Sequence, residues 1–541
     1  MIYNHKMKSG MMFMIHISNN RLVYFGGHLL LGIALLATVS CCVSAEVVHE
    51  SEEPSMFNPY TKETSYKEPY RPQFHFSAKN GWMNDINALW YLNGTYHMTY
   101  QQFTPRHGGY ATSQDLVHWV DRGTALIPED THLRDLGAVP NVSGKQVYSG
   151  SGVVLEGDAA EKITGSPKPA LVTLYTGTAV GTCIAWSNDE GKTWHNYPNN
   201  PVAHPTTFQD PRDPCIVWYA PDQKWICAIY EKGPGDTGFY SPGTSFYRSD
   251  DLIEWEKTSH IDFGFECPDL FELPVDGDPG NKKWVLLDAQ GKYLVGHFDG
   301  KSFMPEQDAK LMDVGPDFYA PQSFYPHNLP EYEIIQIAWM NRWKGGIGWD
   351  KSKTWDRNAT FPVKIALVSQ GDEVVVTRNP IPEISNLYFN SVQLKDEWLV
   401  SPAAGSEKTL LGDIQAKTVD IELVIDMNET TARGMAFQLN NRELYVDLKS
   451  LEIVAKKSFG VGGPKSTTEA RFPLPDDGDG LLSIRILLDW SCLEIFAEGG
   501  RFSYTEQYGF DPQNQNMGLR AVDGKVKIKS LGFHQLKSIW E

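Results

Sequence analysis

Apolar and polar residues alternate along most of the chain after residue 73. Runs such as "KWVLLDAQGKYLVGHFDG" (283–300) and "VDIELVIDMN" (419–428) are short, and Gly, Asn, Asp and Pro separate them from their neighbours. A period of two places successive side chains on opposite faces of a β-strand. Convincing long amphipathic helical patterns are absent from the sequence. The chain is therefore predicted to be all-β.

The stretch "KNGWMNDINALWYLNGTYHMTYQQF" (79–103) predicts two strands, at about 86–92 and 95–101, joined by a tight turn at Asn93-Gly94. An Asn-Asp-Ile-Asn cluster that contains Asp85 precedes the first of them. Such a cluster has two interpretations. It forms a turn through side chain–backbone hydrogen bonds, or it places a carboxylate in an aromatic pocket, where the low dielectric makes its charge useful.

A recurring corner motif predicts how the strands are grouped. "SQDLVHW" begins at Ser113, "SNDEGKTW" at Ser187 and "SDDLIEW" at Ser249, and "FDGKSF" at Phe298 is a weaker fourth copy. A polar turn followed by Trp is expected at a hairpin corner of a four-stranded sheet, although a common turn also recurs by chance. Repeated four-stranded units predict a β-propeller, and residues 73–390 have room for five blades of roughly 60–65 residues each.

The pattern changes after "RNPIPEISNLYF" (378–389). Residues 395–541 contain regular strands, such as "LLSIRILLDWSCLEIFAEGG", but lack the corner motif. This predicts a C-terminal β-sandwich. The expected order is a five-bladed propeller over 73–390, followed by a sandwich over 395–541.

The N-terminus carries the pattern of a signal peptide over residues 1–45. Basic residues precede an apolar run that ends in Val43-Ser44-Ala45, a small-x-small cleavage site. Residues 46–72 are polar and contain Pro, and we expect them to form an N-terminal arm. The mature protein is expected to be secreted or periplasmic. A retained membrane anchor and a lipid-modified N-terminus near Cys41 and Cys42 are the alternatives.

Composition narrows the class of ligand. The formal net charge of −19 argues against nucleic acid or an anionic membrane as a partner and suits a neutral ligand. The sequence has no C-x-x-C, H-E-x-x-H or P-loop motif, so we expect no metal and no cofactor. Five cysteines follow the predicted cleavage site, too few for a disulfide scaffold. Cys215 and Cys227 flank a turn and are either paired or two buried free thiols.

Three acidic residues have unusual surroundings. Asp85 lies in the aromatic stretch, Asp213 in "QDPRDPCIVW" and Glu266 in "FGFECPDLFEL". Each alone is typical of a turn or a solvated residue. A propeller, however, gathers one strand from every blade around its axis, so that residues distant in sequence converge. A glycosidase needs one carboxylate as nucleophile and a second carboxyl, with a pKa raised by burial, as proton donor.

These motifs, in this order, make the chain resemble glycoside hydrolase family 32, the invertase, levanase and inulinase group. The resemblance runs from about 73 to 535. "HFSAKNGWMNDINAL" resembles the family's Trp-Met-Asn-Asp-Pro-Asn-Gly motif, "DPRDP" its Arg-Asp-Pro motif and "FECPDLF" its Glu-Cys motif. "VYSGSGVV", "VGPDFYAPQSF", "IAWMNRW" and "LLDWSCLEIFAEGG" also follow the family order. The family fold is a five-bladed propeller followed by a β-sandwich.

The resemblance implies a role for each matching residue. Asp85 would be the nucleophile, Glu266 the acid and base, and Asp213 the residue that binds fructose hydroxyls and stabilises the transition state. A retaining reaction would require the first two carboxyls about 5–5.5 Å apart. The resemblance also implies a set of substrate-binding residues: Trp82, Asn84, Gln101, Tyr148, Ser149, Arg212 and Trp343.

The sequence departs from the family at two places. Ile86 and Ala88 replace the motif's Pro and Gly. The loop after Gln101 is short, lacks the Trp usual in the family, and has Tyr110 where His is usual. The loop shapes the rim of the site in the family, so its shortening bears on which substrates are preferred.

The expected function is that of a secreted retaining β-fructosidase acting on sucrose or on levan- or inulin-type fructans. Two alternatives remain open. A related five-bladed arabinosidase or xylosidase also uses two Asp and one Glu, and a non-catalytic fructan-binding protein would keep the fold without turnover. The expected partner is the carbohydrate substrate, with no nucleic acid and no membrane partner beyond a possible N-terminal anchor.

Overall fold

The computed structural model describes most of the chain after residue 63 as one unit, within residues 54–541. The described residues are 64–103, 106–204, 209–234, 240–324, 329, 334–341, 354–401, 409–456, 469–476, 478–511 and 513–540. The predicted signal peptide, most of the predicted arm and Trp343 lie outside them. Among the described residues, no helix has the length and apolar character needed to cross a bilayer.

The first hairpin forms as predicted. Strand β1 (Gly81–Leu92) pairs with β2 (Thr95–Phe103), and Leu92 faces Thr95 across the turn. Asn93 and Gly94 take φ angles of 51° and 82°, the left-handed values that a two-residue hairpin turn requires. β1 begins earlier than predicted, so Asp85 lies within the strand. The turn interpretation of the cluster around Asp85 is therefore wrong.

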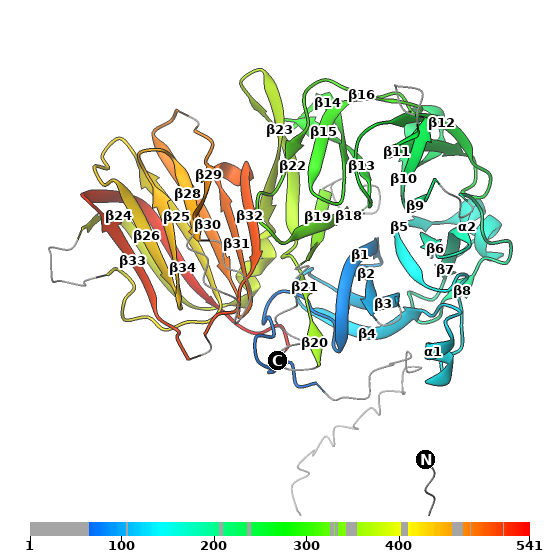
Figure 1. Cartoon of the computed structure of the whole chain (residues 1–541), viewed down its shortest axis with the longest axis horizontal. Helices are drawn as coiled ribbons and strands as arrows, with labels where there is room; N and C mark the ends of the chain where they lie inside the picture. The colour runs from blue at the N-terminus through cyan, green and yellow to red at the C-terminus, as the bar shows by residue number, and fades with distance from the viewer. Residues whose placement is uncertain are drawn as a thin grey trace, which may run out of the picture. The chain divides into compact units, whose positions relative to one another are not determined.

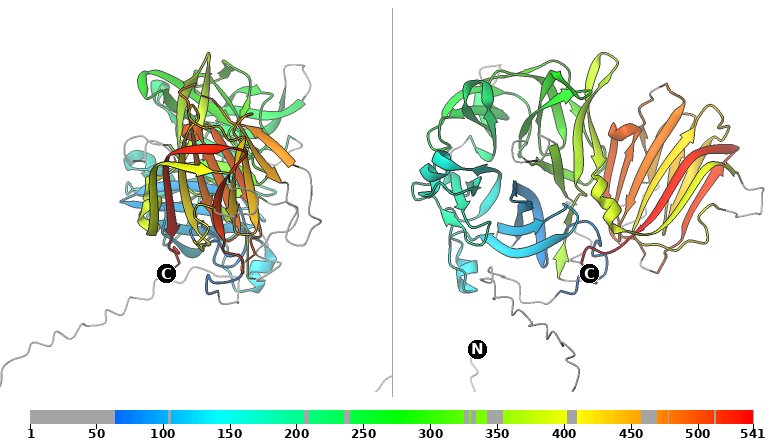
Figure 2. Two further views of the ribbon diagram at one scale, coloured as in Figure 1. Left: turned by 90° about the vertical axis from the view of Figure 1, so that its left-hand side faces the viewer. Right: turned by 180° about the vertical axis from the view of Figure 1, so that it is seen from behind.

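Five four-stranded groups follow one another around a ring (Figure 1), and the right-hand view in Figure 2 shows this ring from behind. The first group is β1 and β2 with β3 (His107–Ser113) and β4 (Trp119–Leu126). The second is β5 (Val147–Leu155), β6 (Ala170–Gly177), β7 (Gly181–Ser187) and β8 (His195–Asn196). The third is β9 (Arg212–Tyr219), β10 (Lys224–Pro234), β11 (Tyr240–Ser249) and β12 (Glu256–Ile261).

The fourth group is β13 (Asp269–Val275), β14 (Asp278–Leu287), β15 (Lys292–Phe298) and β16 (Phe303–Pro305). The fifth is β18 (Phe318–Ser323), β19 (Ile334–Met340), β22 (Val363–Gln370) and β23 (Glu373–Pro380). A parallel contact between Val275 and Leu367 joins these two blades. The ring closes where β20 (Trp355–Asp356) pairs with β1, through Gly81 and Trp355.

The smaller elements connect the blades or extend them. They are α1 (Thr131–Asp135), α2 (Gly157–Thr164), η1 (Ala220–Asp222), β17 (Lys310–Leu311), β21 (Asn358–Ala359) and η4 (Pro382–Leu387). The predicted five-bladed propeller is thus confirmed.

The corner motif connects the third and fourth strands of a blade. In the first copy, Asp115 accepts hydrogen bonds from the backbone N–H groups of Val117 and His118, and the Trp119 indole donates to the Leu116 carbonyl. In the copies at Ser187 and Ser249, the indoles of Trp194 and Trp255 likewise donate to the backbone carbonyl three residues earlier. The motif recurs because each copy makes the same turn and holds its indole by the same hydrogen bond, with Trp119 and Trp194 buried and Trp255 partly buried.

The C-terminal part is a sandwich of two antiparallel sheets, as predicted. One sheet has the order β24-β34-β25-β30-β31-β32 and the other β29-β28-β27-β26-β33. Their inward side chains form a separate apolar core. The strands are β24 (Tyr388–Val400), β25 (Val419–Asp426), β26 (Gly434–Leu439), β27 (Arg442–Asp447), β28 (Glu452–Lys456), β29 (Glu469–Pro473), β30 (Leu481–Leu488), β31 (Cys492–Ala497), β32 (Phe502–Gln507), β33 (Met517–Val522) and β34 (Lys525–Leu536), with η5 (Glu498–Gly500) after β31. Because β24 belongs to this sandwich, we propose a domain boundary near residue 388 rather than 395.

All five cysteines among the described residues are buried and free. Cys215 and Cys227 are therefore two buried free thiols and not a disulfide pair. Burial raises the pKa of the Cys227 thiol, so the thiol stays protonated.

A buried carboxylate ties the start of the propeller to the sandwich. Asp489, in the turn between β30 and β31, accepts hydrogen bonds from the backbone N–H groups of Gln73, Phe74, His75 and Trp490. The His75 ring lies between Asp489 and Glu494, at 3.0 and 2.7 Å. Burial alone would lower the pKa of His75, but the Cys492 sulfur and the hydrogen bonds to both carboxylates raise it well above its usual value.

Replacing Asp489 with Ala should strongly destabilise the protein. The change leaves several buried N–H groups without an acceptor and removes one partner of a buried ion pair, which typically costs about 3–5 kcal/mol. The measurement is the denaturant midpoint of unfolding. The control is Asp476→Ala, which removes an exposed carboxylate that accepts one backbone N–H, from Gly478. Equal losses for the two variants would contradict the role given to Asp489.

Candidate active site

The structure brings the three predicted carboxylates together. Asp85 comes from β1 in the first blade, Asp213 from β9 in the third, and Glu266 from the segment before β13 in the fourth. Cys267 connects them: its N–H donates to Asp213 Oδ2 at 3.2 Å, and its Sγ lies 3.8 Å from Asp85 Oδ2. The residue that follows Glu266 therefore touches both aspartates.

Asp85 points into the site because the strand carries an extra residue there. Met83 pairs with Gln102 and Ile86 with Tyr100, so three steps on β1 match two on β2, as in a β-bulge. Oδ2 of Asp85 accepts hydrogen bonds from Ser149 Oγ at 2.8 Å and Gln101 Nε2 at 3.1 Å. Burial raises the pKa of Asp85 to about 6, the charge of Glu266 adds to the rise, and the Ser149 hydrogen bond opposes it.

Asp213 is the most deeply buried of the three. Its backbone takes a φ of 62°, and its N–H donates to Thr176 Oγ1 at 2.8 Å. Burial and the charges of Glu266 and Asp85 raise its pKa to about 7, against the opposing guanidinium of Arg212, whose Nε lies 3.8 Å away. A carboxyl whose pKa is raised in this way can carry its proton and donate a hydrogen bond to a ligand hydroxyl, and in its ionised form it accepts one.

Glu266 is held at both of its oxygens. Arg212 donates to Oε1 from Nε at 3.2 Å and from Nη2 at 3.0 Å, and Tyr319 donates to Oε2 at 2.6 Å. Glu266 and Cys267 both have positive φ angles, 55° and 38°. Non-glycine residues in this region store strain, which is typical of functional sites and requires support from the surrounding structure.

Several of the predicted binding residues surround these carboxylates. Asn84 donates to Gln101 Oε1, and Gln101 in turn donates to Ser149 Oγ. Tyr148, next to Ser149 on β5, is half-buried, and the guanidinium of Arg106 lies 4.5 Å above its ring. Trp82 is covered in the same way by Arg357 at 4.3 Å. The placement of Trp343 lies outside the described residues.

Sequence reasoning missed four residues that the geometry brings to this region. Cys267 and Tyr319 lie inside quoted motifs, but nothing in the sequence showed that their side chains face the carboxylates. Arg106, in the shortened loop, lowers the pKa of Asp85 through its charge. Arg357 lies between two Trp rings, those of Trp82 and Trp339.

Tyr110 lies away from the site. It is buried on β3, where its hydroxyl contacts His97 Nδ1 at 2.6 Å and donates to the Glu190 carbonyl. The departure at this position therefore affects packing between blades and not the chemistry at the carboxylates.

The arrangement is suited to glycoside chemistry. One carboxylate is oriented by a hydroxyl and an amide, a second carboxyl is held by a cation and a phenol, and a third can donate or accept hydrogen bonds. Such a set can attack a sugar, protonate a leaving oxygen and stabilise positive charge that develops on the ring.

Comparison with known proteins gives a consistent result over residues 75–378 and 386–535. Residues 75–378 match the family model described as "Glycosyl hydrolases family 32 N-terminal domain", and residues 386–535 match the corresponding C-terminal model. A levanase of Bacillus subtilis is 31% identical, over 88% of this chain and 72% of its own length. An extracellular exo-inulinase of Aspergillus niger is 27% identical, over 94% of this chain and 99% of its own length. The crystal structure of an exo-inulinase from Aspergillus awamori superposes with a TM-score of 0.72 at 26% identity, over 88% of this chain and 100% of that one.

The raised pKa of Asp213 predicts that this residue lowers stability at neutral and alkaline pH. In the unfolded chain an aspartate ionises near pH 3.8, whereas in the folded protein Asp213 ionises only near 7. Stability is therefore lost as the pH rises from about 4 to about 7, and the full loss is present above 7. Asp213→Asn removes this loss and should stabilise the protein by up to about 4 kcal/mol at pH 8, since the pKa rises by about 3 units and each unit corresponds to 1.36 kcal/mol.

The gain should nearly vanish at pH 3.5, where the carboxyl is neutral in the folded state and mostly neutral in the unfolded state. The measurement is the free energy of unfolding of both proteins at pH 8 and pH 3.5. Asp372→Asn, at an exposed turn position, is the matched control and should change little at either pH. A stabilisation that is equal at both pH values would show that ionisation of Asp213 is not its cause.

Proposed function

The chain belongs to glycoside hydrolase family 32, and we propose that it is a retaining β-fructosidase that releases terminal β-D-fructofuranosyl residues from levan- or inulin-type fructans or from sucrose. The observation that supports this most directly is the convergence of Asp85, Asp213 and Glu266 around Cys267. The relatives are named levanase, exo-inulinase and, in Schizosaccharomyces pombe, invertase.

In the first step, an oxygen of Asp85 attacks the anomeric carbon of the fructosyl unit while the bond to the leaving oxygen breaks. Glu266 gives its proton to that oxygen, so the leaving group departs as a neutral alcohol. Ser149 and Gln101 fix the orientation of the attacking carboxylate through their hydrogen bonds to Oδ2. A covalent fructosyl-enzyme results.

In the second step, Glu266 accepts a proton from water, and the water oxygen attacks the same anomeric carbon. The ester bond to Asp85 breaks, and fructose leaves with its original configuration. Arg212 and Tyr319 hold Glu266 at both oxygens, which keeps it aimed at one position for both proton transfers. Asp213 binds fructose hydroxyls and stabilises the positive charge of the transition state.

The remaining parts of the proposal follow from the sequence. Trp82, Asn84, Tyr148, Arg212 and Trp343 would complete the sugar pocket, and no cofactor takes part. The signal-peptide pattern supports export, and some relatives are described as extracellular. Membership of a hydrolase family with all three carboxylates present favours turnover over a purely binding role, and it disfavours the arabinosidase alternative.

The direct test is incubation of the purified mature chain with sucrose, inulin and levan, with products separated by chromatography. Exo-hydrolysis releases free fructose as the first and main product. Release of long oligosaccharides from the polymers would contradict an exo-acting enzyme. No product from any of the three would contradict the proposed function itself.

Glu266→Ala should separate acid catalysis from nucleophilic attack. The loss in kcat/KM should reach about 10³-fold on sucrose, equivalent to ~4 kcal/mol, because its leaving group needs a proton. The loss should be smaller on an aryl fructoside, whose leaving group needs little protonation. Added azide should partly restore turnover by attacking the fructosyl-enzyme without base assistance. An equal loss on both substrates, with no effect of azide, would contradict the assignment.

Asp85→Ala should abolish turnover on both substrates, because no fructosyl-enzyme can form without the nucleophile. The measurement is kcat/KM on sucrose and the aryl fructoside, together with circular dichroism to show that the variant is folded. Ala88→Gly, on the same strand, restores a residue usual in the family and is the control, which should keep most of its activity. Near-normal turnover by folded Asp85→Ala would leave Asp85 without a catalytic role.

A further inference from the structure

The shortened loop between β2 and β3 reaches the second blade at Arg106. The carbonyl of Arg106 accepts the N–H of Val147, the first residue of β5, at 3.0 Å. The guanidinium of Arg106 lies 4.5 Å from the centre of the ring of Tyr148, the next residue of that strand. A cation over an aromatic face is attracted by the negative charge of the ring's π-electrons. The residue after Arg106, His107, is buried in β3 and faces Gln102 across the hairpin. Arg106 is therefore held at its backbone and at its side chain.

Ser149, the third residue of β5, holds the nucleophile. It is buried, and its Oγ donates to Asp85 Oδ2 at 2.8 Å. The pairing of β5 with β6 is irregular between Val147 and Gly150, as in a β-bulge, a feature that re-aims side chains beside functional sites. The residue that packs against the guanidinium and the residue that holds the carboxylate are thus neighbours in one short stretch of strand.

The titratable groups that face Asp85 across the ring are acidic. After burial, the charge of Glu266 raises the pKa of Asp85. The Cys267 thiol lies 3.8 Å from Asp85 Oδ2 and stays protonated, because burial raises its pKa well above the usual value. Burial and the charge of Glu266 also raise the pKa of the Tyr319 phenol, and the charges of Glu266 and Asp85 raise that of Asp213. None of these four groups supplies a positive charge that would favour ionised Asp85.

The two guanidiniums at the site serve different carboxyls. Arg212 donates to Glu266 Oε1 from Nε and Nη2, and its Nε lies 3.8 Å from Asp213. Arg106 is the cation that lowers the pKa of Asp85 most, through its charge. An arginine remains charged throughout the pH range in which carboxyls titrate. The site therefore has one cation on the side of Glu266 and Asp213, and a second on the side of Asp85.

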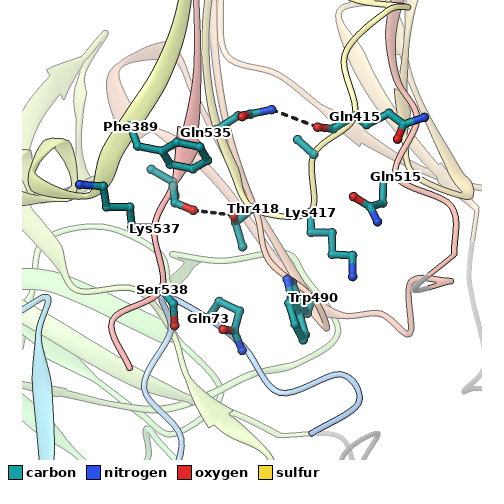
Figure 3. Close-up of a pocket in the computed structure, with 12 residues that line it drawn as sticks. Gln73, Phe389, Gln415, Lys417, Thr418, Trp490, Gln515, Gln535, Lys537 and Ser538 are labelled. Atoms are coloured by element: carbon teal, nitrogen blue, oxygen red, sulfur yellow. Dashed lines mark hydrogen bonds between the residues drawn. The ribbon is translucent and has the colours of Figure 1, made fainter. Parts of the chain in front are cut away.

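The sandwich is not needed for this electrostatic effect. Apart from burial, the groups with the largest effects on the pKa of Asp85 belong to Ser149, Glu266, Arg106 and Cys267, all of them in the propeller. A cavity of about 490 Å³ lies where the start of the propeller meets the sandwich (Figure 3), and none of these four is among the described residues that line it. A substitution at Arg106 should therefore act on the carboxyls without passing through the domain junction.

We propose that Arg106 is a positioning residue for the nucleophile: its charge favours the ionised form of Asp85, and β5 holds the guanidinium and the carboxylate in a fixed arrangement. This proposal rests on the proposed function, in which Asp85 attacks as a carboxylate. The short loop then has an electrostatic role, since it brings a fixed positive charge to a group of carboxyls that would otherwise favour one another's protonation.

The test is the pH dependence of kcat/KM on sucrose for the full-length chain and for Arg106→Met, which removes the charge but keeps an unbranched side chain over Tyr148. On the acidic side, kcat/KM follows the ionised fraction of the nucleophile in the free enzyme. We expect the acidic limb to move up by about half a pH unit, because the carboxylate loses a favourable charge. With a midpoint near 6, kcat/KM should fall about threefold at pH 5 and change little at pH 7.5.

Two further variants serve as controls. Arg106→Lys keeps the positive charge and should restore most of the original pH profile. Arg122→Met removes an exposed arginine of β4, in the same blade, whose Nε donates to Thr112 Oγ1. The loss of this charge should leave the acidic limb in place. If Arg106→Met fails to fold, as judged by circular dichroism, Arg106→Gln gives the same test.

A loss of kcat/KM that is equal at every pH would show a merely structural role and overturn the proposal. An unchanged limb in Arg106→Met, or an equal movement in Arg122→Met, would do the same. If the chain released fructose from no substrate, the proposed function would fail. An NMR titration of the Asp85 carboxyl, in protein with isotope-labelled aspartate and assigned with Asp85→Asn, would still decide the electrostatic role. A higher pKa of Asp85 in Arg106→Met supports this role, and an unchanged pKa contradicts it.

Discussion

The main constraint on this protein is that three carboxyl groups are held close together at one site. Asp85 and Asp213 lose hydration, and each also feels the charge of Glu266, so their pKa values rise to about 6 and 7. Left to themselves, such groups would separate into water. Closure of the propeller prevents this separation, because each residue is anchored in a different blade and β20 pairs with β1 to complete the ring.

Part of the free-energy cost of this arrangement is backbone strain near the carboxyls. Asp213, Glu266 and Cys267 all have positive φ angles, and a bulge in β1 turns Asp85 toward them. Strain of this kind persists only where the surrounding structure leaves no alternative. A hydrogen bond from Ser149 then fixes the direction of Asp85, and hydrogen bonds from Arg212 and Tyr319 fix that of Glu266. Asp213 accepts the backbone N–H of Cys267. The carboxyls are therefore held in one arrangement at a cost in folding stability. Such a trade-off between stability and activity is typical of functional sites.

The sandwich contributes through the junction and not through the carboxylates. Asp489 accepts backbone hydrogen bonds from the start of the propeller, and His75 lies between it and Glu494. These contacts fix the first residues that lead into β1, the strand that carries Asp85. His75, Asp489 and Cys492 are of metal-ligand type and lie close together, but Asp489 already accepts several N–H groups, so the cluster acts as a structural connection.

The sequence by itself determined the all-β class, the five blades and the sandwich, because alternation and the Ser-Asp-Trp corners are local patterns. Its ordered motifs also pointed to Asp85, Asp213 and Glu266, through their resemblance to a family. The sequence could not decide whether Asp85 lies in a turn or in a pocket, because the bulge that orients it depends on the register of two strands. It did not reveal Arg106, Tyr319 or Arg357 at the site, or the connection between His75 and Asp489. Those contacts join residues far apart in the chain, and only closure of the ring and docking of the sandwich bring them within hydrogen-bonding distance.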